Sequence, residues 1–213
     1  SEDVDSAHPA MSAKRGWVSC EPLYENNPEE IKAIIENGSG QEAYLITLKL
    51  SGDPGASARD LSGAKIVSQK EFDLIADAAT SSGKKIIFDA GMASPAVLAM
   101  AKNSSLKKED FFLMYDPFSY IAEYGRYPEG KDTILKIVNE CTETDSHCLC
   151  ADGSVYKHAG ATIVEEAALM LALASEYIAA VPDHKKEMAA KSLFFKTSSG
   201  PLYFPEMAKM RAL

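Results

Sequence analysis

The chain has 213 residues, 46% of them hydrophobic, which is enough to bury one large core. Its formal net charge of −9 argues against non-specific nucleic-acid binding, which needs clustered Lys and Arg to neutralise phosphates. No apolar run is long enough to span a bilayer, and the acidic start lacks the layout of a signal peptide. We therefore expect a cytoplasmic protein that contacts neither nucleic acid nor membrane.

Short apolar runs alternate with segments of helical period, which is typical of a parallel βα architecture. The predicted strands are 17–23, 44–50, 85–88, 111–115, 147–151 and 193–197. Four helix starts between them are indicated by Asn27 with Pro28, Ser68, Ser94 with Pro95, and Lys131 with Asp132. A fifth helix is predicted over 162–180, because Pro182 prevents its continuation.

The fifth helix is predicted to pack on the core through one face. The residues on that face are Ala167, Leu171, Ala174 and Ile178. The glutamates placed elsewhere on the helix are Glu165, Glu166 and Glu176. After this helix, the charged segment 184–191 is predicted to be a link to the sixth strand.

About six βα units can be counted, whereas a closed (β/α)8 barrel has eight and typically about 250 residues. The predicted fold is therefore an α/β TIM-barrel type, incomplete over 16–213, after a disordered or extended segment 1–15. Two sheet edges with unpaired backbone groups would remain. We expect either that the chain is a piece of a longer one, or that another chain covers these edges.

Two acidic residues, Asp89 and Asp116, follow predicted strands at the face where barrel sites are built. Acids at this face can serve as general bases or metal ligands. No His or Lys converges on them in the sequence, so helix capping and loop shaping are the favoured interpretation. The loop 51–63 lies on the same face and contains Arg59, but it lacks a glycine-rich phosphate motif and is interpreted as a surface loop.

The four cysteines are too few for a disulfide framework and are expected to be reduced. Cys141, Cys148 and Cys150 lie close to His147 in the sequence, a combination that suggests a metal site. The spacing of Cys148 and Cys150 lacks the two-residue spacer of zinc knuckles. Buried strand thiols are therefore favoured, and no metal site is predicted.

Two motifs late in the chain carry a family resemblance. The letters GSVYKHAGAT stand at 153–162, before a helix that ends in Ser-Glu-Tyr, and GPLYFPEMAKMRA follows at 200–212. In this order they resemble the substrate-barrel domain of the adenosylcobalamin-dependent methylmalonyl-CoA mutase family. The similarity is strong over 151–213 and diffuse earlier, where GWVSCEP at 16–22 and NNPEE at 26–30 resemble the family's first strand and helix.

The resemblance implies that two active-site residues are replaced. Catalytic chains of the family carry Gly-Tyr-His-Met-Gln-Glu before Ala-Gly-Ala, and their Tyr and His reach the substrate. The aligned positions are Ser154 and Val155, and an aliphatic Val can neither donate a hydrogen bond nor carry a proton. His158 stands at the position of the Glu and is interpreted as a solvated loop residue. The resemblance thus implies that this chain has no catalytic residues.

The resemblance further implies the small, non-catalytic subunit of a heterodimeric mutase. Its partner would be the large catalytic subunit, which binds adenosylcobalamin and interconverts methylmalonyl-CoA and succinyl-CoA. Asp145 and His147 match part of the family's cobalamin fingerprint, but its Gly is replaced by Cys150, so no cofactor is expected here. The alternative is an independent TIM-barrel enzyme that uses Asp89, Asp116 and His158 for acid–base chemistry on a small acyl-CoA or carboxylate.

Overall fold

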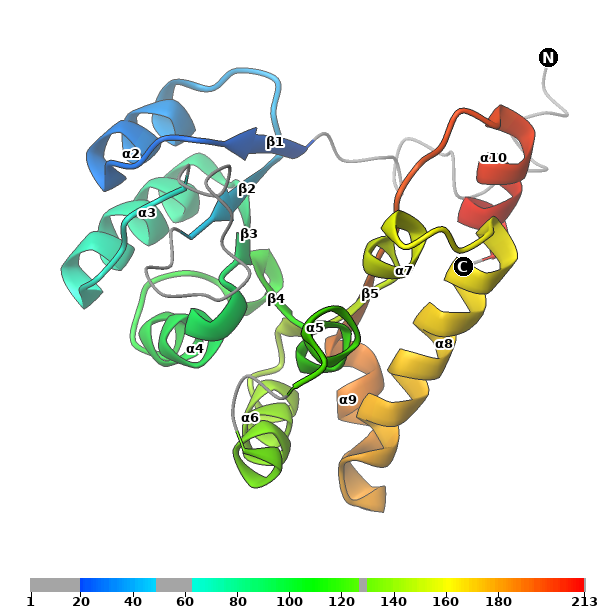
Figure 1. The fold of residues 1–213 in the computed structure, drawn as a ribbon. Coiled ribbons are helices and arrows are strands. Elements are labelled where there is room, and N and C mark those ends of the chain that lie inside the picture. The colour runs from blue at the N-terminus through cyan, green and yellow to red at the C-terminus, as the bar shows by residue number, and fades with distance from the viewer. Residues whose placement is uncertain (1–19, 49–62, 127–129, 213) are drawn as a thin grey trace, which may run out of the picture.

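The computed structural model describes residues 20–48, 63–126 and 130–212, which form a single parallel sheet with helices packed on it (Figure 1). The strand order is β1-β2-β3-β4-β5-β6, and every neighbouring pair is parallel. The strands are β1 Cys20–Leu23, β2 Ala43–Thr47, β3 Lys85–Asp89, β4 Phe111–Tyr115, β5 His147–Asp152 and β6 Leu193–Lys196. Consecutive parallel strands with intervening helices are the arrangement of a (β/α) barrel wall, which confirms the predicted fold class.

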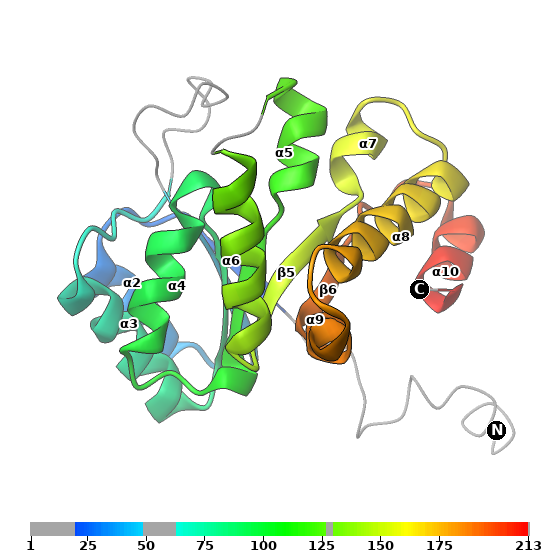
Figure 2. The same cartoon turned by 90° about the horizontal axis from the view of Figure 1, so that it is seen from below.

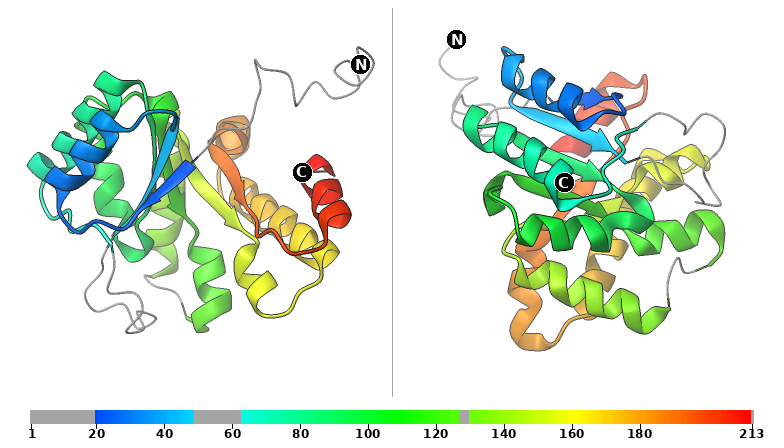
Figure 3. Two further views of the ribbon diagram at one scale, coloured as in Figure 1. Left: turned by 90° about the horizontal axis from the view of Figure 1, so that it is seen from above. Right: turned by 90° about the vertical axis from the view of Figure 1, so that its left-hand side faces the viewer.

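The α-helices of the described residues are α2 Pro28–Asn37, α3 Gln69–Ser82, α4 Ser94–Lys102, α5 Pro117–Tyr124, α6 Lys131–Glu143, α7 Ser154–His158, α8 Ile163–Ala179, α9 Lys186–Ser192 and α10 Tyr203–Ala212. Helices α2, α3, α4, α6, α8 and α9 contribute to the core on one face of the sheet, and two further views show their arrangement (Figure 3). Figure 2 shows α5 and α7 beside each other at the carboxyl end of the strands. Among the described helices, none combines the length and the apolar composition needed to cross a bilayer.

Strand alternation separates a helix-covered face from an inner face. On β3, Ile86 and Phe88 are buried, whereas Ile87 and Asp89 point to the other side and stay partly exposed. Phe72 of α3 stacks on Phe88 with ring centroids 5.2 Å apart, so the core lies between sheet and helices. We call the side of the sheet that carries Ile87 and Asp89 the inner face.

Three helices begin at positions that the sequence indicated, and each is capped there by a side chain. Asn27 caps α2, and Ser68 forms a capping box at the start of α3. Thr162 forms a second capping box with Glu165 at the start of α8. These caps satisfy backbone N–H groups that have no partner inside the helix, which is why they fix the boundaries.

The predicted buried face of α8 is only partly correct: Ala174 is buried, and Ala167 and Ile178 are half-buried. The helix buries Glu166, Met170, Leu173, Ala174 and Tyr177. Leu171, which was expected in the core, is 53% exposed. The physical reason is that Glu166 finds a buried cation and hydrogen-bond donors, so a charged residue can occupy the core side of the helix.

Four helices were not predicted, namely α5, α7, α9 and α10. The expected link 184–191 contains most of α9, whose residues Ala189 and Ser192 are buried. Short helices such as these depend on packing and caps more than on a long apolar period. The predicted segment 1–15, the start of the first strand, and the loop 51–63 up to residue 62 lie outside the described residues.

Candidate functional site

Three charged side chains, Asp89, Asp152 and Lys196, lie at the carboxyl ends of β3, β5 and β6 within electrostatic range of one another. Asp152 and Lys196 are paired in the strand register, and Lys196 Nζ lies 2.8 Å from Asp152 Oδ2. Burial lowers the pKa of Lys196, but attraction by Asp152 and Asp89 outweighs this effect, so the pKa is raised. Lys196 therefore stays charged at neutral pH and does not act as a neutral amine nucleophile.

Asp89 ends β3 beside this ion pair. Burial raises the pKa of its carboxyl group; Lys196 opposes the shift and the negative charge of Asp152 adds to it. A carboxyl group with a raised pKa takes up a proton more readily than an ordinary aspartate does. Asp89 is thus the one of the two predicted acids whose surroundings suit proton transfer.

Asp116 is occupied by structural hydrogen bonds. It is the N-cap of α5, and its Oδ1 accepts from Ser119 N at 3.0 Å and from the Tyr177 hydroxyl at 2.6 Å. Its Oδ2 accepts from the backbone N–H of Asp152 at 2.7 Å. Burial raises its pKa, and these hydrogen bonds partly counteract that effect. The carboxylate joins β4, β5, α5 and α8, and this arrangement fits the interpretation of Asp116 as a capping residue.

Ser154 and Val155 begin α7 directly beyond β5. The Ser154 hydroxyl and backbone N–H both donate to Asp152 Oδ1, the N–H at 2.8 Å, so the hydroxyl is engaged within its own turn. Val155 presents an aliphatic side chain to a cleft of about 340 Å³ between α5 and α7. The residues that line this cleft are Ala122, Glu123, Val155, Tyr156, His158 and Ala159.

The three acid–base candidates named from the sequence do not form one constellation. His158 is exposed at the end of α7 and lines the α5–α7 cleft. Within the described part of the chain, it makes no hydrogen bond or ion pair with Asp89 or Asp116. The structure instead places Asp89 within electrostatic range of Lys196 and Asp152.

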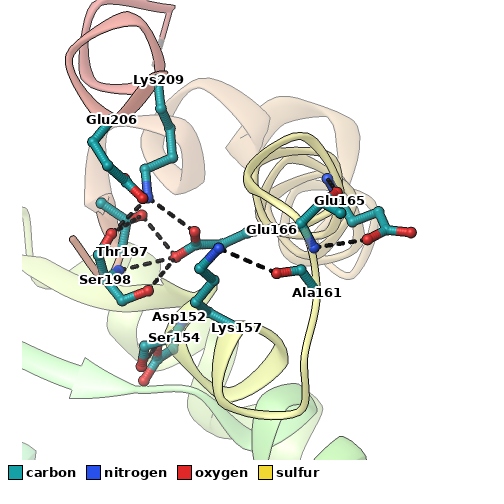
Figure 4. Close-up of polar contacts among 11 residues, drawn as sticks. Asp152, Ser154, Lys157, Ala161, Glu165, Glu166, Thr197, Ser198, Glu206 and Lys209 are labelled. Atoms are coloured by element: carbon teal, nitrogen blue, oxygen red, sulfur yellow. Dashed lines mark hydrogen bonds and ion pairs between the residues drawn. The ribbon is translucent and has the colours of Figure 1, made fainter. Parts of the chain in front are cut away.

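A buried charged network lies next to this site and joins α8, α10 and the segment after β6 (Figure 4). Glu166 Oε2 accepts from Lys209 Nζ at 2.9 Å, and Lys209 Nζ also lies 2.7 Å from Glu206 Oε2. Glu166 Oε1 accepts from the Thr197 hydroxyl at 2.8 Å and from Ser198 N at 2.9 Å. The side chains of Glu166 and Lys209 are fully buried.

Lys209 is the cation shared by the two glutamates of the network. Burial raises the pKa of Glu166, but the hydrogen bonds from Lys209, Ser198 and Thr197 outweigh it, so the pKa is lowered. Burial lowers the pKa of Lys209, but Glu206 and Glu166 outweigh this effect, so the pKa is raised. Thr197 and Ser198 directly follow Lys196, so the network holds the backbone next to the Asp152–Lys196 pair.

Sequence reasoning missed Asp152, Lys196, Glu166 and Lys209. Asp152 directly follows a predicted strand, which is the same signal that identified Asp89. Lys196 lies near the end of a predicted strand, and the parallel order of the strands would have placed it beside Asp152. Glu166 carries no comparable signal, because its partner Lys209 is 43 residues away.

The residues of the partial cobalamin fingerprint lie at the amino end of β5. Asp145 lies in the turn before β5 with φ 56°, and His147 begins β5 at the opposite end of the strand from Asp152. The His147 ring stacks on Phe112 with centroids 4.6 Å apart and hydrogen-bonds to the backbone of Lys191. In residues 20–48, 63–126 and 130–212, no group of three His, Cys, Asp or Glu side chains is arranged to hold a metal ion.

Comparison with known proteins gives one family match. The family model described as methylmalonyl-CoA mutase matches residues 92–213, which is more than half of the chain. No curated protein matches the sequence. The matched range begins before α4 and contains Asp116, Asp152, Lys196 and the whole Glu166 network.

Proposed function

Because the chain belongs to the methylmalonyl-CoA mutase family, we propose that it acts as, or as part of, the non-catalytic small subunit of a heterodimeric mutase. The large subunit interconverts methylmalonyl-CoA and succinyl-CoA, and this chain supports it as a binding partner. Adenosylcobalamin, bound by the large subunit, supplies the radical chemistry. No residue of this chain is assigned to the reaction.

The observation that carries the proposal is the start of α7. Ser154 and Val155 stand where catalytic chains of the family carry Tyr and His. The Ser154 hydroxyl donates to Asp152, and Val155 offers only methyl groups to the α5–α7 cleft. A group that positions or protonates a substrate has to carry a polar atom that is free to reach it, and neither side chain meets that condition.

The open sheet supports a partner. In the described residues β1 and β6 each pair with one neighbouring strand only, so each has a free edge. Free edges bind additional strands or associate unless another element covers them. A second chain of related fold is a suitable cover, which agrees with the role of an interaction subunit.

One observation favours the second candidate, an independent enzyme acting on a small acyl-CoA or carboxylate. Asp89 has a raised pKa and lies beside a charged Lys on the inner face, as a general acid or base requires. Two observations oppose it. Asp116 is fully hydrogen-bonded, and His158 contacts neither acid in the described structure.

The test combines binding and turnover. The purified chain is mixed with the large mutase subunit, and complex formation is followed by light scattering. Isomerisation of methylmalonyl-CoA is then assayed with adenosylcobalamin for each chain and for the mixture. We expect a complex whose turnover requires the large subunit and is unchanged when this chain carries Asp89→Ala or His158→Ala. Turnover by this chain alone, lost in Asp89→Ala, would overturn the proposal and support the independent enzyme.

A further inference from the structure

Two buried cysteines meet where α6 joins β5. Cys141 lies in the last turn of α6, and Cys148 is the second residue of β5. Only a short turn separates the two elements, and Asp145 in that turn has a left-handed backbone with φ 56°. This reversal brings the end of the helix back onto the start of the strand. The side chains of both cysteines are fully buried.

Two hydroxyl groups bridge the pair. The Ser192 hydroxyl accepts from Cys148 N at 3.2 Å and donates to the Cys141 carbonyl at 3.4 Å. The Thr144 hydroxyl donates to the same carbonyl at 2.7 Å and lies 3.5 Å from Cys148 Sγ. The two thiols are close enough to shift each other's pKa. Thr144, which contacts Cys148 Sγ, is partly exposed.

We propose that Cys141 and Cys148 form a redox-active pair that closes a disulfide when the folded protein meets a hydroperoxide. This modification is independent of the proposed subunit role, because it requires only contacts within this chain. It would fasten the end of α6 to the start of β5. A buried disulfide at this point would join two elements that α9 also contacts through Ser192.

The surroundings give the two thiols different roles. Interaction with Cys141 lowers the pKa of Cys148, burial opposes this, and Lys102 lowers the pKa further. The same interaction and burial raise the pKa of Cys141. Cys148 is the thiol whose sulfur contacts the partly exposed Thr144, so we assign the first reaction to Cys148 and the second attack to Cys141.

The chemistry balances without a further reactant. The Cys148 thiolate attacks one oxygen of hydrogen peroxide, the O–O bond breaks, and a sulfenic acid and one water molecule are formed. The Cys141 sulfur then attacks the Cys148 sulfur, the S–O bond breaks, and a second water molecule leaves with the thiol proton. The two sulfurs are oxidised and the peroxide is reduced.

Cys150 is a matched control on the same strand. It is as fully buried as Cys148. Burial and three nearby carboxylates raise its pKa well above that of an ordinary thiol. Because its neighbours are carboxylates instead of a second thiol, it should remain reduced under conditions that oxidise the pair. Cys20 is exposed and would form disulfides between molecules, so the test uses a Cys20→Ser background.

The experiment treats folded Cys20→Ser protein with increasing hydrogen peroxide, removes the peroxide, alkylates the remaining thiols in denaturant, and digests after glutamate. Cleavage after Glu140 and Glu143 separates Cys141 from the other two cysteines. We expect a linked pair of peptides containing Cys141 and Cys148, with Cys150 alkylated. Dithiothreitol should restore all three thiols. Cys150→Ser should retain the link, and Cys141→Ser should lose it.

Three outcomes would overturn the proposal. In the first, all three buried thiols remain alkylatable at a peroxide dose that fully oxidises Cys20 in the unmutated chain. In the second, Cys148 accumulates as sulfinic acid without a link to Cys141. In the third, the link forms only after the protein has been unfolded in denaturant. The disulfide mapping in the Cys20→Ser protein, which retains Cys141, tests the proposal even if the Cys141→Ser variant does not fold.

Discussion

Asp116 illustrates how a buried carboxylate can be committed to structure. Three groups donate to its two oxygens, namely the Tyr177 hydroxyl and the backbone N–H groups of Ser119 and Asp152. An ionised carboxylate has only acceptor sites and therefore suits three donors. Asp89 also ends a strand and its backbone carbonyl accepts from Leu48 N, but no hydrogen bond to its carboxylate is found among the described residues, although Lys196 attracts it. The two acids therefore respond to mutation in opposite ways.

Asp116→Asn is expected to destabilise the fold by about 2 kcal/mol, because the amide NH2 would face a donor and leave that donor unsatisfied. If the NH2 replaces Oδ2, the backbone N–H of Asp152 loses its acceptor; if it replaces Oδ1, Ser119 N and the Tyr177 hydroxyl lose theirs. Urea unfolding followed by circular dichroism measures the loss. An unchanged midpoint would show that the three hydrogen bonds contribute nothing net.

Asp89→Asn is expected to stabilise the fold at neutral pH. The folded-state pKa of Asp89 is raised, so wild-type stability decreases as pH rises from the unfolded value towards the folded value. Asn does not ionise and avoids this loss, while Lys196 keeps its partner Asp152. The gain should disappear below about pH 3.9, the pKa of an unfolded aspartate. Unfolding curves above and below that pH test this, and a gain that persists in acid would contradict it.

Lys209→Met is expected to cost about 3 kcal/mol of stability, because it leaves the buried Glu166 without its cation. Lys191→Met is the matched control. It removes an exposed ion pair with Glu187 of similar length, 2.8 Å, within one helix, and should leave the unfolding midpoint within experimental error. Equal losses in the two variants would show that burial of the Glu166 network adds nothing.

At the scale of elements, the contact between α7 and α8 depends on Gly153. A Cβ atom at this position would lie 2.5 Å from Met170 Cγ and 2.6 Å from Met170 Sδ. Both distances are well inside van der Waals contact. The backbone of Gly153, with φ −77°, is accessible to any residue, so the need for glycine comes from packing alone.

Gly153→Ala is therefore expected to destabilise the protein by about 2 kcal/mol through overpacking against α8. Gly130→Ala is the control, because a Cβ at Gly130 meets nothing within 4 Å. In Gly130→Ala, alanine is a poorer N-cap residue, which lowers stability, but it also reduces the entropy of the unfolded chain, which raises stability. The two effects should offset each other, so we expect little net change. Thermal unfolding of both variants gives the comparison. A stable Gly153→Ala variant would mean that Met170 moves aside at little cost.

The elements that could be predicted from the sequence are those with a local signal. All six strands were located, because short apolar runs ended in polar or turn residues, and helices with a side-chain cap began where expected. The face of α8 could be predicted only in part. Its orientation depends on Lys209, and the apolar pattern alone placed Leu171 in the core.

The candidate site was predictable only in part for the same reason. Asp89 and Asp116 were identified because each follows a strand, but their different surroundings depend on contacts with other strands and with α8. Lys196 was overlooked because one sequence does not show which charges meet across a sheet. Spacing along the chain also did not show that Cys141 and Cys148 share Ser192.

At the scale of the whole molecule, exposed apolar side chains lie on β6, which pairs with one strand only in the described residues, and at the start of α10. Phe195 of β6 is 39% exposed, and Leu202, Tyr203 and Phe204 are exposed at the start of α10. An edge strand with exposed aromatic residues is a site of association. The isolated chain is therefore expected to self-associate as its concentration rises.

Phe195→Glu should reduce this association, because a charge on an edge strand opposes pairing with another strand. Val164→Glu is the control, since Val164 is 77% exposed but lies on helix α8, away from the strand edge. Sedimentation velocity over a range of concentrations measures both variants. An equal reduction in the two variants would show that added negative charge, and not the strand edge, is responsible.

The distance along the chain between Glu166 and Lys209 has a consequence during synthesis. The ribosome adds Glu166 of α8 first, and Lys209, which pairs with it, is added 43 residues later. Until then, a nascent chain that packed α8 in its final orientation would bury a carboxylate without a counter-charge. Helix α8 should therefore reach its final packing only late in translation, after α10 has been made. Ribosome-bound chains that stop before α10 should remain sensitive to protease around α8.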